Sequence, residues 1–227
     1  MISTTAISPI LTIPPLENGD KLTRHEFERR YHAMPNLKKA ELIEGVVYVA
    51  SPVRAKQHGK PHARIMGWLI AYEAATPGVE ALDNTTVLLD TDNEPQPDAL
   101  LRIETGGQSR INKDDYVEGA PELIVEIAAS SASYDLHEKL KVYRRNQVQE
   151  YLIWRVYDYQ FDWIRLQQGE YIQLQPNADN IICSQIFPGL WLDKIALLGG
   201  DLGTVLAVLH QGLASTEHDN FISRLSS

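Results

Sequence analysis

Two carboxylates beside apolar segments are the residues of this chain best suited to chemistry. Asp98 directly precedes the apolar run Ala99–Leu101, and Glu126 interrupts the apolar run 123–128. An ionised carboxylate in a buried strand is costly unless a cation or a hydrogen-bond donor compensates it. Two carboxylates on neighbouring strands can share a hard divalent cation, which prefers oxygen ligands. Together with Lys139 downstream, they predict a site that hydrolyses phosphodiester bonds.

The predicted strand 122–128 gives this site a shape. Because side chains alternate between the faces of a strand, Glu126 and Ala128 point the same way. The small side chain of Ala128 leaves room for a ligand, and the peptide carbonyl of Ile127 is a further oxygen donor. We therefore expect Mg²⁺ to bind Asp98, Glu126, the carbonyl of Ile127 and water.

Lys139 lies on the predicted helix 134–145, one turn after Asp135. If this helix packs beside the Glu126 strand, the ammonium group reaches a nucleophilic water or a phosphoryl oxygen and stabilises negative charge there. The alternative is structural: Asp135 and Lys139 form a solvated ion pair, and Glu126 forms a bridge with an arginine or a lysine. The spacing alone leaves both interpretations open.

Composition limits the class of protein. The 227 residues are 44% hydrophobic and 22% charged, which fits one compact domain. A formal net charge of −9 argues against indiscriminate binding to duplexes through bulk positive potential. The single cysteine, Cys183, argues against an intramolecular disulfide and a cysteine-rich zinc site. Without a secretory signal or a run of about 18 apolar residues, we expect a cytoplasmic protein.

Apolar periodicity and turn residues predict the elements that must position these side chains. We expect an extended arm over residues 1–20, one domain over 21–213 and a flexible tail over 214–227. Within the domain the patterns predict helices after Thr23 and over 58–72, 134–145 and 204–213, hairpins over 42–49 and 161–174, a strand pair formed by 85–89 and 98–103, strands over 122–128 and 151–156, and a flexible loop over 104–119. A helix between strands 122–128 and 151–156 predicts a parallel crossover and hence a mixed α/β sheet.

A family resemblance covers roughly residues 22–198. The ordered motifs that carry it are Glu41–Gly45, Ser51-Pro52, His58, Pro97-Asp98, Gly119–Ile127, Asp135, Lys139, Tyr143, Glu150-Tyr151 and Phe187–Leu190. This set resembles the Uma2 family, a domain of unknown function (820) that is abundant in cyanobacteria and is similar to PD-(D/E)XK nucleases. The resemblance implies an α/β fold with a restriction-endonuclease-like mixed β-sheet, flanked by helices and carrying extra β-hairpins.

The resemblance also implies roles for single residues. Asp98 corresponds to the motif aspartate and Glu126 to the second metal-binding acid. The classical motif has a lysine two residues after the glutamate, where this chain has Ala128. The family instead takes its lysine from the next helix, which implies Lys139. Glu41 corresponds to an acid that touches the metal through water, and its alternative is an exposed carboxylate at a helix end.

Further candidates are less specific. His58 can orient or protonate a leaving group, because histidine titrates near neutrality, or it can be a surface or capping residue; His62 has a weaker claim. Lys141 and Arg144 can contact phosphates, although basic residues also favour the C-terminal ends of helices. Tyr143 can donate a hydrogen bond to the site or belong to the core.

Together these features predict a Mg²⁺- or Mn²⁺-dependent endonuclease that cleaves DNA with metal-activated water and no covalent intermediate. The alternative is a nuclease-fold binding or regulatory protein without activity, which the acidic charge and Ala128 favour. A two-carboxylate glycosidase would need a wide cleft with exposed aromatics, whereas only 8% of the residues are aromatic. We expect a homodimer, because cutting both strands of a duplex needs two sites.

Overall fold

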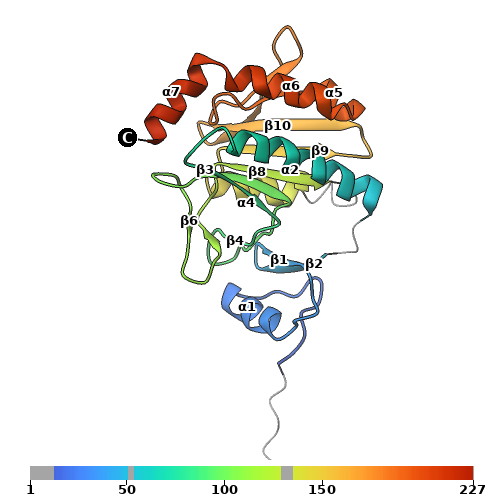
Figure 1. The fold of residues 1–227 in the computed structure, drawn as a ribbon. Helices are drawn as coiled ribbons and strands as arrows, with labels where there is room; N and C mark the ends of the chain where they lie inside the picture. The colour runs from blue at the N-terminus through green and yellow to red at the C-terminus, as the bar shows by residue number, and fades with distance from the viewer. Residues whose placement is uncertain (1–12, 51–53, 129–134, 227) are drawn as a thin grey trace, which may run out of the picture.

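The computed structural model describes residues 13–50, 54–128 and 135–226. Its centre is a six-stranded mixed sheet with the strand order β11-β10-β9-β8-β5-β3 (Figure 1). The strands are β3 Val79–Asp83, β5 Ala99–Ile103, β8 Leu123–Ala128, β9 Glu150–Arg155, β10 Gln160–Gln167 and β11 Glu170–Gln173. Strands β8 and β9 are parallel, and the other neighbouring pairs of this sheet are antiparallel.

Strand β8 lies inside the sheet, and apart from Glu126 its residues are apolar toward both faces, as expected of a strand that is covered on both sides. All six of its residues are buried. Val125 pairs with Ala99 of β5 on one side and with Leu152 of β9 on the other. A π-helical turn, η2 Asp135–Lys139, and helix α4 Leu140–Arg145 precede β9. The predicted parallel crossover is therefore confirmed.

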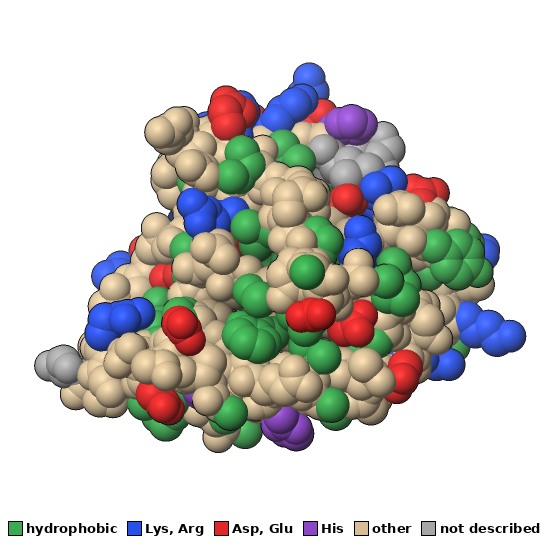
Figure 2. All heavy atoms as spheres, turned by 90° about the horizontal axis from the view of Figure 1, so that it is seen from above, with side chains coloured by type: hydrophobic (Ala, Val, Ile, Leu, Met, Phe, Trp, Pro, Cys, Tyr) green, Lys and Arg blue, Asp and Glu red, His purple; other side chains and the backbone are tan. Residues whose placement is uncertain are grey.

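The two faces of the sheet carry separate hydrophobic clusters. Leu123, Val125 and Ile127 pack in the cluster covered by α2 Lys60–Glu73, α5 Lys194–Gly199, α6 Leu202–Leu213 and α7 Thr216–Leu225. Ile124 and Ala128 pack on the other face, together with residues of α4. The alternation predicted for 122–128 is thus confirmed. On the helix-covered side of the molecule, described acidic and basic side chains are interspersed among hydrophobic ones (Figure 2).

Smaller elements lie around the central sheet (Figure 1). Thr23 accepts a hydrogen bond from the Glu26 amide at 3.4 Å and caps α1 Arg24–His32, as its position predicts. The predicted first hairpin consists of β1 Ala40–Ile43 and β2 Val46–Val49. The remaining elements are η1 Ala55–Gly59, a three-stranded sheet of β4 Val87–Leu88, β7 Val117–Glu118 and β6 Arg110–Ile111, and a hairpin of β12 Ile181–Cys183 and β13 Trp191–Asp193.

The predicted pairing of 85–89 with 98–103 is wrong. The antiparallel partner of β5 is β3, and Val87 pairs in parallel with Val117 of β7. Two prolines, Pro95 and Pro97, separate the two predicted partners and have no N–H to donate to a ladder. The apolar content of the two candidate segments does not by itself predict which of them pairs with β5, the strand that follows Asp98.

The predicted flexible loop 104–119 is also wrong, because it contains β6 and β7. Its structure depends on two buried side chains outside it. Glu122 accepts hydrogen bonds from the amides of Ile103 and Gln108, and Arg102 donates to Ser109. These hydrogen bonds link residues that are distant in the sequence, so the polar, glycine-rich composition of the segment does not predict them.

The chain ends differ from the expectation in one respect. Residues 1–12 of the predicted N-terminal arm lie outside the described residues, and Leu16 is buried against the α1–hairpin cluster. The predicted flexible tail is wrong for Thr216–Leu225, which form α7 after a Ser215 cap and bury Phe221. Of the helices in the described ranges, none combines the length and hydropathy of a transmembrane span.

Candidate active site

The two motif carboxylates lie side by side on adjacent strands. Asp98 directly precedes β5, and Glu126 is the fourth residue of β8, next to the Ala99–Val125 pair. Asp98 is 4% exposed and Glu126 is 3% exposed. Beyond Ala99, where the β5–β8 ladder has ended, Asp98 Oδ2 accepts the Ile127 N–H at 2.7 Å. The side chain of Asp98 therefore provides the acceptor that a longer strand would have supplied.

Lys139 joins Glu126 to the first hairpin. Its Nζ atom lies 2.8 Å from Glu126 Oε1 and 2.9 Å from Glu41 Oε1, and the residue is 2% exposed. Glu41 comes from β1 and accepts the amide N–H of Gln96 at 2.7 Å. Tyr143, one turn after Lys139 on α4, donates its hydroxyl to Glu126 Oε1 at 2.9 Å. A buried ammonium group thus lies between two buried carboxylates.

A second lysine, Lys39, is the fifth charged residue of the site. Its Nζ atom lies 3.4 Å from Asp98 Oδ1. Burial lowers the pKa of Lys39, but the carboxylates of Glu41, Asp98 and Glu126 outweigh this effect, so that the pKa is raised. We call Lys39, Glu41, Asp98, Glu126 and Lys139 the carboxylate–lysine cluster. Three carboxylates and two ammonium groups leave these five residues with one net negative charge.

Two histidines border the cluster from η1 and α2. His58 Nε2 lies 3.5 Å from Asp98 Oδ1. His62 Nε2 lies 2.9 Å from the Asp98 carbonyl oxygen and 2.9 Å from Asp83 Oδ1. The two rings stack with their centroids 5.6 Å apart. His58 therefore faces the motif aspartate, while His62 connects the backbone of Asp98 to β3.

The structure brings five predicted site residues together, namely Glu41, His58, Asp98, Glu126 and Lys139. The two residues predicted to contact phosphates project from the exposed side of α4, where Lys141 pairs with Glu138 at 3.1 Å and Arg144 pairs with Glu170. The peptide of Ile127 contacts Asp98 through its N–H, and a metal contact of its carbonyl stays a prediction. The side chain of Asp135 lies outside the described residues, so its predicted pairing with Lys139 stays a prediction too.

Lys39 is the charged residue that sequence analysis missed. A usable signal exists, because Lys39 and Glu41 are two positions apart next to a predicted strand and so face the same way. The sequence allows Tyr143 either a core role or a site role, and its contacts in the structure combine the two. Its ring belongs to the cluster of the α4 face, and its hydroxyl reaches Glu126.

Glu150, which also lies in the motif set, serves the fold. It is fully buried and accepts hydrogen bonds from Trp163 Nε1 at 3.0 Å, Ser184 Oγ at 2.8 Å and the amide of Gln185 at 2.7 Å. Burial raises the pKa of Glu150, although these donors oppose the shift. The carboxylate ties β9 and β10 to the segment that follows β12.

The donor set of the cluster suits a hard divalent cation in kind, because it consists of carboxylate oxygens next to strand backbone. In the described ranges of the chain, however, no three His, Cys, Asp or Glu side chains form a ready-made metal site. Lys139 Nζ lies between Glu41 and Glu126, within 3 Å of one oxygen of each.

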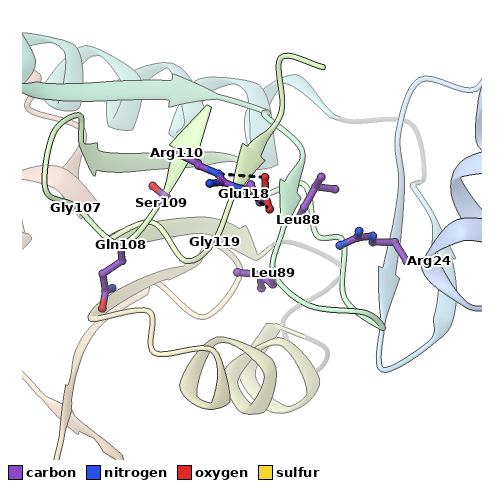
Figure 3. A pocket seen from close by; sticks show the side chains of 9 residues that line it. All are labelled: Arg24, Leu88, Leu89, Gly107, Gln108, Ser109, Arg110, Glu118 and Gly119. Atoms are coloured by element: carbon purple, nitrogen blue, oxygen red, sulfur yellow. Dashed lines mark hydrogen bonds and ion pairs between the residues drawn. The ribbon is translucent and has the colours of Figure 1, made fainter. Parts of the chain in front are cut away.

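A separate hollow of about 420 Å³ lies at the three-stranded sheet (Figure 3). Arg110 points from β6 toward Glu118 of β7 and pairs with it at 3.1 Å. Arg24, on the opposite side, donates to the Asp90 carbonyl at 3.0 Å and pairs with Glu28 at 3.1 Å. Because these two guanidinium groups already have partners, we assign no ligand to this hollow.

Comparisons with known proteins agree with this architecture. The family model of Uma2, described as "Putative restriction endonuclease", matches residues 25–196, which is more than half of the chain. The chain therefore belongs to the Uma2 family. A solved structure titled as a "putative nuclease belonging to DUF820" from Anabaena variabilis has a TM-score of 0.54 at 12% identity, over 80% of this chain and 97% of that one. The restriction-endonuclease-like fold is thereby confirmed. No curated protein matches the chain.

Glu94, four residues before Asp98, is a buried carboxyl group outside the cluster. Burial raises its pKa from 4.5 to about 8; the charge of Glu28 adds to the rise, and Arg24 opposes it. Between these two pH values the folded protein keeps a proton that the unfolded chain releases. Stability therefore falls as the pH rises through this window, by about 1.4 kcal/mol per unit of pKa shift.

We expect Glu94→Gln to remove this loss, because an amide does not titrate. In urea unfolding at pH 5 and pH 8.5, the wild type should lose a few kcal/mol that the variant keeps. Glu118→Gln changes a partly exposed carboxylate on β7, which pairs with Arg110, and serves as the control. An equal loss in Glu94→Gln and wild type would contradict the assignment.

Proposed function

We propose that this protein is an endonuclease that hydrolyses phosphodiester bonds in DNA at the carboxylate–lysine cluster, with Mg²⁺ or Mn²⁺ held by Asp98 and Glu126. The observation that carries this proposal is the convergence of five charged side chains from four chain segments beside the central strand β8. Membership of the Uma2 family, whose description is "Putative restriction endonuclease", supports the same class of reaction.

The net charge of the cluster favours a cation. Burying three carboxylates needs compensation, and two ammonium groups supply only part of it. When bound, a divalent ion supplies Lewis acidity and lowers the pKa of water. With the ion, the five residues would carry one net positive charge, which complements one phosphodiester group.

Each side chain of the cluster has a role in the proposal. Lys139 stabilises negative charge on a phosphoryl oxygen and positions the attacking water. Glu41 and Tyr143 hold Lys139 and Glu126 in place through the contacts described above. His58, next to Asp98, donates a proton to the leaving oxygen. Lys141 and Arg144 contact phosphates farther along the strand, and a homodimer presents two sites to the two strands of a duplex.

A second candidate is a nuclease-fold binding protein without catalysis. It is favoured by the ion pairs of Lys139, whose ammonium group lies 2.9 Å from Glu41 and 2.8 Å from Glu126 and supplies a countercharge that both carboxylates share. In such a protein the lysine would be a permanent structural countercharge. The two candidates differ in whether the cluster binds a divalent ion.

Titration calorimetry with Mn²⁺ distinguishes these candidates. We expect the wild type to bind Mn²⁺ and to nick plasmid DNA when Mn²⁺ or Mg²⁺ is present, because Asp98 and Glu126 supply hard oxygen ligands. Glu126→Gln should weaken Mn²⁺ binding by about tenfold or more, since it removes the negative charge of one ligand.

Glu122→Gln is a matched variant, because Glu122 directly precedes β8 and is equally buried, but it accepts hydrogen bonds from the amides of Ile103 and Gln108 and lies outside the cluster. It should retain Mn²⁺ binding. Wild-type protein that neither binds Mn²⁺ nor cleaves DNA would reject the nuclease and leave the binding protein.

A further inference from the structure

The carboxylate–lysine cluster is closest to solvent on the side of Lys39 and His58. The side chains of Lys39 and His58 are 22% and 18% exposed, whereas the other side chains of the cluster are at most 10% exposed. Lys39 Nζ and His58 Nε2 lie 3.4 and 3.5 Å from the same oxygen, Asp98 Oδ1. The most accessible side of the cluster is thus bordered by these two side chains.

The two chain segments that carry Lys39 and His58 are joined at the base of the first hairpin. Lys39 directly precedes β1, and its carbonyl accepts the N–H of Ala50, just after β2, at 3.1 Å. Arg54 is the N-cap of η1, the turn that carries His58. The exposed residues next to Lys39 and His58 therefore border this side of the site.

These exposed residues are basic. Residues 45–72 contain no aspartate or glutamate, although the whole chain has 30 acidic residues against 21 basic ones. Arg54, Lys56 and Lys60 belong to this stretch and are exposed, as is Lys38 beside Lys39. We call Lys38, Arg54, Lys56 and Lys60 the basic rim. None of its four side chains forms an ion pair with a side chain in the described part of the chain. A local positive surface thus lies beside the site of an acidic protein.

The basic residues of α4 differ from the basic rim in their partners. Lys141 pairs with Glu138 at 3.1 Å, and Arg144 pairs with Glu170. Each of these pairs has no net charge, so its attraction for a phosphate group is weak. Each residue of the basic rim contributes a full positive charge instead, and such charges attract an anionic partner to the adjacent site.

We propose that the basic rim binds DNA phosphates that flank the scissile group; naming DNA as the partner rests on the proposed function. Charge complementarity selects this occupant, because contacts to phosphates orient a nucleic acid on a protein without reading its sequence. From Arg54 to Lys60 the chain extends about 9 Å at the helical rise of about 1.5 Å per residue. This length corresponds to two or three nucleotides of a strand, at about 3.4 Å each.

Fluorescence anisotropy with a labelled duplex of about 20 base pairs, in EDTA and at low salt, tests the rim without any cleavage. The full-length wild type should bind the duplex. The double variant Lys56→Gln/Lys60→Gln should bind it about tenfold more weakly, because two phosphate contacts are lost. The slope of log K against log salt should fall in magnitude by about 1.8, since each contact contributes about 0.9.

Lys113→Gln is the matched control, because Lys113 is exposed in the turn between β6 and β7 and its loss removes one positive charge outside the basic rim. Each single variant, Lys56→Gln and Lys60→Gln, should weaken binding more than Lys113→Gln does. Thermal unfolding should be the same for all these proteins, since the substituted side chains are exposed.

The outcomes separate this inference from the proposed function. Binding in EDTA that depends on Lys56 and Lys60 supports the basic rim even if no metal ion enables the protein to cleave DNA. Full cleavage of limiting DNA by Lys56→Gln/Lys60→Gln overturns the rim and leaves the nuclease. Absence of binding by the wild type, an equal effect of Lys113→Gln, or binding to vesicles of anionic phospholipid in preference to DNA also overturns it.

Discussion

Replacing Asp98 with asparagine is expected to lower Mg²⁺-dependent cleavage of DNA by about a thousandfold or more. Asparagine keeps the size of the side chain and an oxygen that accepts the Ile127 N–H, but it removes the charge that would hold a divalent ion. A metal ion contributes several kcal/mol to the stabilisation of the transition state, and each 1.36 kcal/mol changes the rate tenfold. Single-turnover conversion of supercoiled plasmid to the nicked form measures the effect.

The comparison needs a variant that changes an aspartate elsewhere. Asp114→Asn lies in the exposed turn between β6 and β7 and should cleave like the wild type. Thermal unfolding should show that Asp98→Asn is folded, because it keeps the acceptor that ends the β5–β8 ladder. Activity of Asp98→Asn within tenfold of the wild type would remove the cluster from the mechanism.

Replacing Lys139 with methionine is expected to destabilise the fold by about 3–5 kcal/mol at neutral pH. The ammonium group is buried between Glu41 and Glu126, and its removal leaves both carboxylates without this countercharge. Breaking a buried ion pair from one side costs far more than the pair itself contributes, because a charge remains in a medium that solvates it poorly. Urea unfolding of the purified variant measures the loss.

Two further variants identify the cause of this loss. Adding Glu126→Gln to Lys139→Met should restore part of the stability, because a neutral side chain needs no countercharge. Lys141→Met, two residues away and exposed, should stay within about 0.5 kcal/mol of the wild type. Equal destabilisation by Lys139→Met and Lys141→Met would show that Lys139 is not a buried countercharge.

Much of the fold follows from local sequence patterns. The run 123–128 is apolar toward both faces and has the length of a strand, so its central position and its parallel partner β9 could be predicted. The hairpin at Glu44-Gly45 follows from turn residues that adopt left-handed backbone angles, with φ of 52° and 70°. A strand and a tight turn of this kind depend on residues that are a few positions apart, so the sequence of a single short segment predicts them.

Pairings between distant segments could not be predicted in this way. Strand β3 pairs with β5 because prolines separate β5 from the competing segment 85–89 and because one edge of β5 remains available to β3. Helix α7 forms because Phe221 packs against the hydrophobic cluster on the helix-covered face of the sheet. The polar segment 104–119 is ordered by Glu122 and Arg102, which lie outside it. Each of these outcomes is a competition among contacts that are far apart in sequence.

The sequence by itself determined which residue types were available for chemistry, namely a carboxylate inside an apolar strand, another at the start of its neighbour and a lysine on the next helix. Only the tertiary structure decided that Lys139 lies between Glu126 and Glu41, and that Lys39 and His58 approach Asp98. The physical reason is that burial makes an unpaired charge costly, so a charged residue in an apolar segment predicts that a partner is needed. The identity of that partner depends on which distant segments the fold brings within about 3 Å.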